Sequence, residues 1–206
     1  MLDIWGRASS SNVQKVLWCC AELGLTYRRH DIGREFGGNR EPAYLEMNPN
    51  GLVPTLCDGD LVIWESNAIV RYLAARYDGE SLYPKALGPR SQVDQWLDWE
   101  LGTLAPTIFP VFWSLIRTPP EQRDAKALAT ATEKLTEAWQ LLDKHLAKRP
   151  YVAGDQLTLA DIAMGNSIYR WFAFPIERPS MPMLKAWYDR LATRPGFKEH
   201  LAKPLV

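Results

Sequence analysis

Three neighbouring residues, Glu65, Ser66 and Asn67, place a carboxylate, a hydroxyl and an amide at the start of a predicted helix. The helix is indicated by apolar residues at three- and four-residue spacing, namely Ile69, Tyr72, Leu73 and Tyr77. The first turn of a helix has N–H groups without intrahelical partners and carries the positive end of the helix dipole, so it can hold a carboxylate. This segment therefore predicts a binding site for an anionic group of a ligand.

Val53 and Pro54 form a second feature with binding chemistry. A proline that opens a strand has no N–H for the sheet ladder, and the backbone of the residue before it is left free to pair elsewhere. A short extended peptide has the matching backbone groups. Taken singly, each motif is more typical of an ordinary hairpin with a trans proline and a serine N-cap, but their order and spacing together favour a peptide-like ligand.

A hairpin is expected to position both features. Two β-prone runs, at 55–58 and 61–65, flank an Asp-Gly dipeptide, the pair that best closes a two-residue turn with positive φ at both positions. The second strand runs directly into the helix described above, and Gly79 stands where a left-handed C-cap would end that helix.

Histidine and cysteine chemistry is not favoured by the sequence. The three histidines have no spacing that would build a metal site or a Ser-His-Asp triad, so no metal is predicted. Cys19, Cys20 and Cys57 form no even framework, and the adjacent pair has poor geometry for a disulfide. Reduced thiols are expected, with Cys19 and Cys20 in the core of the first helix.

Composition points to a small ligand. The chain has 206 residues, with 24 Lys and Arg and 24 Asp and Glu, so no basic excess favours nucleic acid or an anionic membrane. The residues at the first strand do not read as a signal peptide, so none is expected, and the most apolar later stretch, 104–113, is too short to span a bilayer. A cytoplasmic location is expected.

Residues 1–78 are predicted to fold as β-α-β-α-β-β-α, a thioredoxin-like arrangement. Strands at 2–5 and 27–32 flank a helix for which Asn12 is the expected N-cap, and a short helix at 41–47 precedes the hairpin. Glycines and prolines at 79–88 mark a linker. The pattern of 89–206 is wholly helical, so the fold class is α/β plus all-α.

Two local features are expected in the helical part. A long helix with apolar positions from 93 to 108 should be kinked or interrupted by Pro106 and Pro110. Thr158, with Asp161 three residues later, predicts a capping box at the start of another helix.

The motifs N-P-x-G-x-V-P-T-L, D-G-D and E-S-N-A-I, all between 48 and 69, resemble the glutathione-site signature of the cytosolic glutathione transferases. The resemblance covers nearly the whole chain, and the helical part, 89–206, resembles the C-terminal domain of that family. It implies a cis Val53–Pro54 bond, a Val53 backbone paired with the cysteinyl unit of glutathione, and Glu65 and Ser66 at its γ-glutamyl end. At the glycyl end this chain has Asn39 and Leu52, where several classes have histidine and lysine.

The same resemblance assigns the group that faces the glutathione sulfur. In the serine classes the activating hydroxyl lies six residues before a valine of the first helix, which is Ser10 here, with Ser9 and Ser11 as alternatives. Asn12 corresponds to an asparagine of Nu-like bacterial members. A tyrosine mechanism is not favoured, because Trp5 stands where the tyrosine classes have their tyrosine.

The second substrate is expected between the domains. An aromatic group consisting of Phe109, Phe112, Trp113 and Tyr169 is the candidate electrophile pocket, although core packing explains most aromatic residues at helical spacing. The leading hypothesis is a homodimeric glutathione transferase acting on a small hydrophobic electrophile. The alternatives are a glutathione-dependent disulfide or peroxide reductase and a non-catalytic interaction protein with the same fold.

Overall fold

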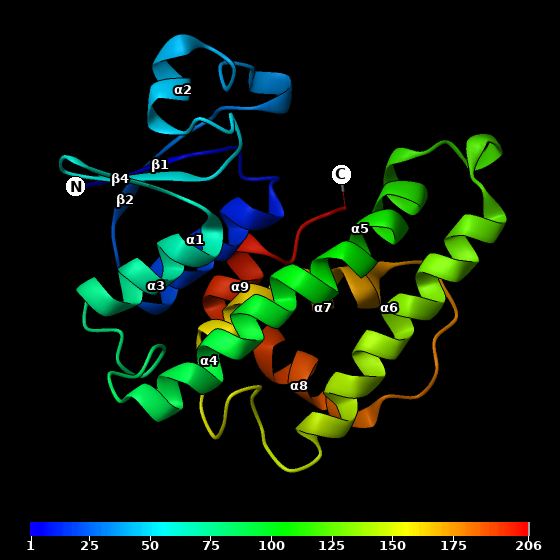
Figure 1. The fold of residues 1–206 in the computed structure, drawn as a ribbon. Coiled ribbons are helices and arrows are strands. Elements are labelled where there is room, and N and C mark those ends of the chain that lie inside the picture. Colours follow the sequence, from blue (N-terminus) through cyan, green and yellow to red (C-terminus); the bar gives the residue numbers. More distant parts are fainter. Residues whose placement is uncertain (206) are drawn as a thin grey trace.

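A four-stranded sheet forms the N-terminal part of the chain, with the strand order β2-β1-β3-β4. This computed structural model describes residues 1–205. Strand β1 is parallel to β2 and antiparallel to β3, and β3 is antiparallel to β4. Helix α2 lies on one side of the sheet, and α1 and α3 lie on the other (Figure 1). The elements of this part are β1 (Leu2–Trp5), α1 (Ser11–Glu22), β2 (Tyr27–His30), α2 (Pro42–Met47), β3 (Thr55–Asp58), β4 (Leu61–Trp64) and α3 (Ser66–Arg76).

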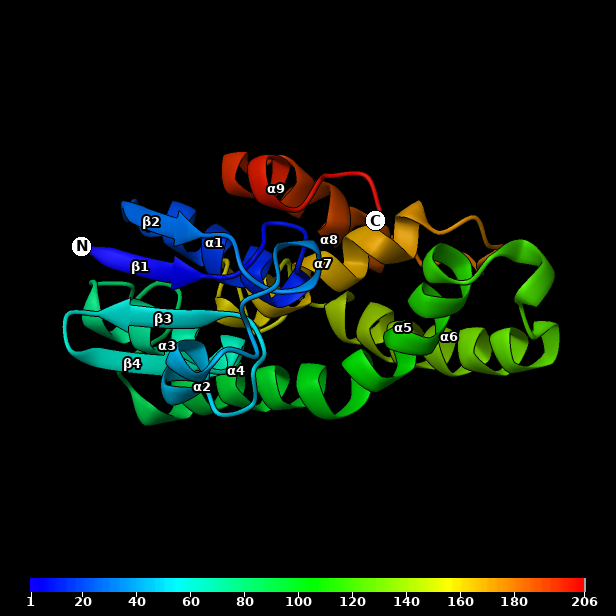
Figure 2. The same cartoon turned by 90° about the horizontal axis from the view of Figure 1, so that it is seen from above.

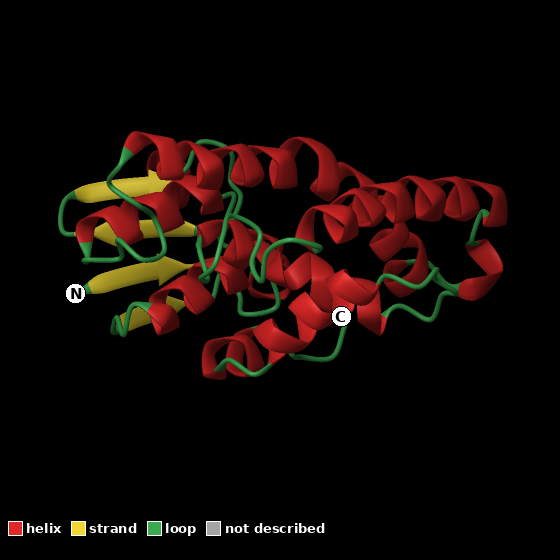
Figure 3. Cartoon of the chain, turned by 90° about the horizontal axis from the view of Figure 1, so that it is seen from below, coloured by secondary structure: helices red, strands yellow, loops and turns green. Residues whose placement is uncertain are grey.

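The rest of the described chain is helical, and all strands lie at one end of the molecule (Figure 3). Helix α7 lies in the middle, between α1 and α5 (Figure 2). The predicted thioredoxin-like half followed by an all-helical half is thus confirmed. The helices are α4 (Leu87–Trp99), α5 (Ala105–Phe112), α6 (Ala125–Leu146), α7 (Leu159–Ala173), α8 (Pro182–Ala192) and α9 (Pro195–His200).

Three local predictions need correction. The hairpin turn consists of Gly59 and Asp60, because Asp58 pairs with Leu61. Of these two residues only Gly59 has a positive φ, 60°, as in a type II′ turn rather than the expected type I′. The N-cap of α1 is Ser10, whereas Asn12 lies in the first turn.

The end of α3 also differs from the prediction. Asp78, with φ 53°, takes the left-handed conformation expected of Gly79. Gly79 is needed for a different reason: a Cβ there would lie 2.8 Å from the Cα of Ala74 and 2.7 Å from a methyl group of Leu23. The expected interruption of the long helix is present as a π-helical turn over Glu100–Leu104, which ends two residues before Pro106, while Pro110 is accommodated inside α5.

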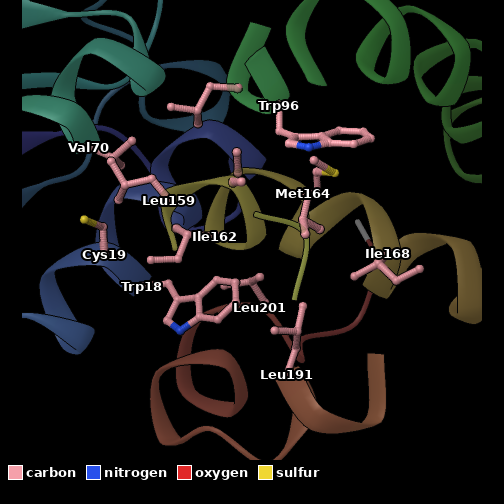
Figure 4. Packing of buried hydrophobic residues seen from close by; sticks show 14 of the residues in the cluster. Trp18, Cys19, Val70, Trp96, Leu159, Ile162, Met164, Ile168, Leu191 and Leu201 are labelled. Carbon is pink, nitrogen blue, oxygen red and sulfur yellow. The ribbon is translucent and has the colours of Figure 1, made fainter. Parts of the chain in front are cut away.

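The two halves share one hydrophobic core, and Trp18 of α1 belongs to it (Figure 4). Its indole ring packs beside Ile162 of α7 and Leu201, and it is fully buried. Two glycines make room for the ring: a Cβ at Gly165 would overlap it, and a Cβ at Gly196 would lie 2.7 Å from its Cδ1. The first helix therefore fits into a slot built by the last third of the chain.

Candidate active site

The backbone of Val53 is available to a ligand. The Val53–Pro54 peptide bond is cis, as the sequence predicted. Strand pairing starts at Thr55, and within residues 1–205 no hydrogen bond joins the N–H or the carbonyl of Val53 to the protein. The carbonyl of the preceding Leu52 accepts hydrogen bonds from Tyr44 Oη at 2.6 Å and Asn48 Nδ2 at 2.9 Å, which hold this segment in place.

The N-terminus of α3 is open as well. The first intrahelical N–H to find a partner is that of Ile69, which donates to the Glu65 carbonyl, so the N–H groups of residues 66–68 are free of helix bonds. Glu65 precedes the helix with φ 72°, a left-handed conformation that is uncommon outside glycine. Its carboxylate-bearing side chain is exposed to solvent.

Asn12 links the loop before α1 to this helix start. Ser66 Oγ donates to Asn12 Oδ1 at 3.4 Å, so two groups that are far apart in sequence meet at one place. Asn12 is exposed, and with Ser11 and Arg170 it lines a cavity of about 150 Å³. The cavity lies between the first half of the chain and helices α5 and α7.

Ser10 is placed differently from Asn12. It is the N-cap residue of α1, is only 8% exposed, and makes no capping bond with its hydroxyl. Ser9 lines a second cavity, of about 320 Å³, and Ser11 lines the smaller one, whereas Ser10 is among the lining residues of neither. The sulfur-facing role of Ser10 stays a prediction.

A buried polar network lies beneath the α3 terminus. Lys15 Nζ donates to Asn67 Oδ1 at 2.8 Å and to Glu100 Oε2 at 3.2 Å. Asn67 Nδ2 in turn donates to the Leu97 carbonyl at 3.1 Å. Lys15 and Glu100 are 4% and 6% exposed, so this ion pair is shielded from water. The network fixes the start of α3 against α1 and α4.

The thiols of α1 are unsuited to nucleophilic chemistry. Cys19 and Cys20 are fully buried, as expected. Burial raises the pKa of Cys20 to about 12, and burial followed by the nearby Cys20 raises the pKa of Cys19 well above its usual range. Within residues 1–205, no group of three or more His, Cys, Asp and Glu side chains is arranged to hold a metal ion.

Comparison with known proteins now identifies the fold family. Residues 9–76 match the family model "Glutathione S-transferase, N-terminal domain", and residues 104–195 match "Glutathione S-transferase, C-terminal domain". Glutathione S-transferase GstB of Escherichia coli is 41% identical over the full length of both chains. The chain belongs to the glutathione S-transferase family.

Two further relatives support this. Glutathione S-transferase F9 of Arabidopsis thaliana is 34% identical, over 98% of this chain and 97% of its own. The theta class glutathione S-transferase of Xanthomonas axonopodis pv. citri, solved with glutathione bound, is 47% identical and superimposes with a TM-score of 0.95, over 100% of this chain and 99% of that one. In the present chain, no helix among the described residues is long and apolar enough to cross a membrane.

At the predicted glycyl end, Asn39 has a structural contact. Its Nδ2 donates to the Gly51 carbonyl at 2.7 Å, which holds the loop that precedes Val53. Leu52, which stands where many transferases have lysine, is 59% exposed and offers no polar side-chain atom. The part of Asn39 in binding stays a prediction.

The four aromatic residues predicted for the electrophile do not line one cavity. Phe109 borders the 150 Å³ cavity with Asn12, whereas Phe112 and Tyr169 border the 320 Å³ cavity. Trp113 borders neither of these two; its ring packs against that of Phe109, with centroids 5.6 Å apart, on the exposed side of α5. The reason is helical geometry, because residues 109 and 113 are one turn apart on one face whereas 112 points into the core.

Sequence reasoning missed the network of Lys15, Asn67 and Glu100, as well as the two arginines, Arg117 and Arg170, that lie over the ring of Phe112. The sequence did not indicate that Lys15 is buried, because a lone lysine beside the apolar face of a helix is usually solvent-exposed. Arg170 was not singled out either, although it lines both cavities.

Proposed function

We propose that this protein conjugates the thiol of glutathione to a small electrophile. The proposal rests chiefly on the free backbone of Val53 near the open N-terminus of α3. Glutathione offers a backbone-like cysteinyl unit for Val53 and a γ-glutamyl carboxylate for the helix N–H groups at Ser66. Glu65 is suited to pair with the γ-glutamyl amino group. The family of the chain and the glutathione-bound theta class relative agree with this assignment.

In this proposal the protein's polar groups lower the pKa of the bound thiol. A free thiol with a pKa near 8.5 is only about 3% ionised at pH 7. Hydrogen bonds from Ser10 or Asn12, together with the N-terminus of α1, lower that pKa by roughly two units and raise the thiolate fraction about 25-fold. A less basic thiolate is also a weaker nucleophile, by about eightfold for such a shift, so positioning of the electrophile supplies most of the acceleration.

Calorimetry and a turnover assay test this function. We expect glutathione to bind, and the protein to accelerate its reaction with a simple aryl halide at pH 6.5. Disulfides and peroxides are assayed in parallel. Turnover of these alone would support the reductase alternative, and a failure to bind glutathione would support the non-catalytic one. The reductase reading is less favoured, because the segment 8–13 has no cysteine and Cys19 and Cys20 are buried.

We further propose that the protein is a cytoplasmic homodimer that acts without a metal. Apolar side chains lie exposed on strand β4, at the sheet edge, where Leu61 is 45% and Trp64 39% exposed. Equilibrium sedimentation should give twice the chain mass of 23.5 kDa. A single-chain mass at micromolar concentration would contradict the dimer.

A further inference from the structure

Arginine side chains from four segments lie close enough to act on one another, and one of them, Arg170, lines both cavities. Arg7 comes from the loop before α1, Arg34 from the loop after β2, Arg117 from the segment after α5, and Arg170 from α7. The guanidinium of Arg170 lies over the ring of Phe112, 3.9 Å from its centroid, and that of Arg117 lies 5.7 Å from the same centroid. Two guanidinium groups therefore make cation–π contacts with the same aromatic ring.

Within residues 1–205 these arginines form no ion pair, although the carboxylate of Glu35 lies close enough to act on Arg7 and Arg117. Nε of Arg7, Arg117 and Arg170 is buried and has no hydrogen-bond partner among residues 1–205. The ion pairs found in that range include none of these three side chains or Arg34. A buried polar atom without a partner costs free energy, so a bound water, ion or ligand is expected to pair with it.

The charges also repel one another. Burial, followed by the fields of Arg117 and Arg34, lowers the pKa of Arg170 to about 10. Burial and then Arg34 lower the pKa of Arg7, and the carboxylate of Glu35 only partly opposes this. Cations held together in this way bind an anion more strongly than a single exposed arginine does, because the anion removes the repulsion as well as filling the unpaired donors.

The position of Arg170 indicates which of the two substrates, glutathione or the electrophile, carries the anionic group. Arg170 lines the 150 Å³ cavity together with Ser11 and Asn12, where the glutathione sulfur is proposed to lie. The other two charged residues of that cavity, Lys15 and Glu100, neutralise each other at 3.2 Å. The uncompensated charge beside the sulfur is thus that of Arg170.

We propose that the electrophile of this transferase carries a carboxylate or similar anionic group, which binds between Arg117 and Arg170. Arg7 and Arg34 strengthen the positive potential around it. This inference rests on the proposed transferase function and replaces the purely hydrophobic electrophile that the sequence led us to expect. In the reaction, the glutathione thiolate forms the new C–S bond, the leaving group departs with its electron pair, and the carboxylate of the electrophile stays unchanged.

The glycyl carboxylate of glutathione is a second possible source of the anion. Arg7 lies on that side: a Cβ at Gly33 would be 3.3 Å from Nη1 of Arg7, 3.7 Å from Cγ1 of Val53 and 3.9 Å from Cγ of Asn39. Arg117 and Arg170 belong to the helical half of the chain, so we assign them to the electrophile. The experiment must separate the two sources.

Two aryl chlorides that differ in charge provide the test: 4-chloro-3,5-dinitrobenzoate and its neutral amide. For each, kcat/KM is divided by the rate constant of the uncatalysed reaction with glutathione. We expect the wild-type protein to favour the carboxylate by this measure. Arg170→Gln and Arg117→Gln should each reduce the carboxylate-to-amide ratio about tenfold or more, as expected for loss of a charge-assisted hydrogen bond.

Arg178→Gln is the matched control. Arg178 also has a buried Nε without a partner and lies 5.6 Å from the ring centroid of Trp171. Unlike Arg117 and Arg170 it does not lie over Phe112, and its Nη2 donates to the Phe174 carbonyl at 2.6 Å. Its substitution should leave the ratio unchanged. Thermal unfolding of each variant shows whether the fold survives.

Three outcomes would overturn the inference. The first is a wild-type protein that turns over the amide as well as the carboxylate, and the second is a ratio that Arg170→Gln and Arg117→Gln leave unmoved. The third is calorimetry in which these variants weaken glutathione itself while the ratio stays constant, which would assign the anion to the glycyl carboxylate. Absence of turnover with either chloride would instead contradict the proposed transferase function.

Discussion

At the scale of single residues, Glu65 combines an unfavourable backbone with an exposed carboxylate. A non-glycine residue at φ 72° costs of order 1–3 kcal/mol, and such conformations gather at binding sites. We expect Glu65→Ala to weaken glutathione binding by at least 1 to 2 kcal/mol, because it removes a charged partner of the γ-glutamyl amino group. Titration calorimetry measures the loss. Glu133→Ala, an exposed glutamate of α6, is the control, and equal affinity of both variants would remove Glu65 from the site.

Ser10 and Asn12 are alternative candidates for the residue that hydrogen-bonds to the glutathione sulfur. If Ser10 faces the sulfur, Ser10→Ala should raise the pKa of the bound thiol by about one unit, equivalent to roughly 1.4 kcal/mol, with little change in glutathione affinity. The ultraviolet absorbance of the bound thiolate, followed against pH, gives that pKa directly. If Asn12→Ala or Ser11→Ala shifts the pKa of the bound thiol and Ser10→Ala does not, the role belongs to an asparagine-centred or shifted-serine site.

The sequence predicted local chain geometry: the Val53–Pro54 bond is cis and a helix starts at Ser66, as expected. Both features belong to one hairpin and the helix that follows it, so residue spacing alone could reveal them. The roles of these residues in binding stay a prediction. Arg117 and Arg170 come from helices far away in sequence. Their meeting at Phe112 depends on how α5 and α7 pack, which no local pattern encodes.

At the scale of elements, the start of α7 is held by more than the predicted capping box. Asp161 Oδ2 accepts hydrogen bonds from both the N–H and the hydroxyl of Thr158, and its Oδ1 accepts from Val152 N at 2.9 Å and Trp187 Nε1 at 2.9 Å. Burial raises the pKa of Asp161, and these donors oppose the rise. One buried carboxylate thus joins the start of α7 to the preceding loop and to α8.

The two capping-box residues should therefore contribute unequally to stability. Thr158→Ala removes one capping hydroxyl and should cost about 1 kcal/mol. Asp161→Ala leaves three N–H donors without an acceptor, and at about 1–3 kcal/mol for each it should cost roughly 3 kcal/mol or more. Denaturant unfolding measures both, with the exposed Asp189→Ala as control. Equal losses for Thr158→Ala and Asp161→Ala would contradict this account.

Element types were predictable because hydrophobic periodicity and turn residues are local signals, but several element ends were not. Gly79 is a typical C-cap by sequence, yet close packing against Ala74 explains it, and Asp78 takes the left-handed backbone. Strand register decided the hairpin turn, since the pairing of Asp58 with Leu61 puts Gly59 at the first turn position. In both places contacts between elements outweighed the local preference.

At the scale of the whole molecule, histidine burial predicts a loss of stability at mildly acidic pH. Burial lowers the pKa of His145, whose Nε2 lies 2.8 Å from the Val152 carbonyl, and burial also lowers the pKa of His200. The folded state thus favours neutral imidazole. Below the unfolded pKa of about 6.5 the unfolded chain binds more protons, so this stability is present above that pH and lost as the pH falls.

We expect the denaturant midpoint to be lower at pH 5.5 than at pH 7.5. His145→Gln, which keeps a polar nitrogen without the titration, should make the difference smaller. The exposed Lys126→Gln is a control for general charge effects. A pH dependence that is identical in His145→Gln and the wild type would exclude this histidine as a source.

The slot for Trp18 has a consequence for biosynthesis. Trp18 is synthesised with the first helix, but the glycines that make room for its indole ring, Gly165 and Gly196, follow 147 and 178 residues later. At about 5–20 residues per second this corresponds to roughly 7–36 s of translation. During that time the nascent thioredoxin-like half presents to solvent, or to a chaperone, a large apolar ring whose neighbours in the last third of the chain have not yet been made. The first half of this protein therefore emerges from the ribosome before the surface that completes it exists.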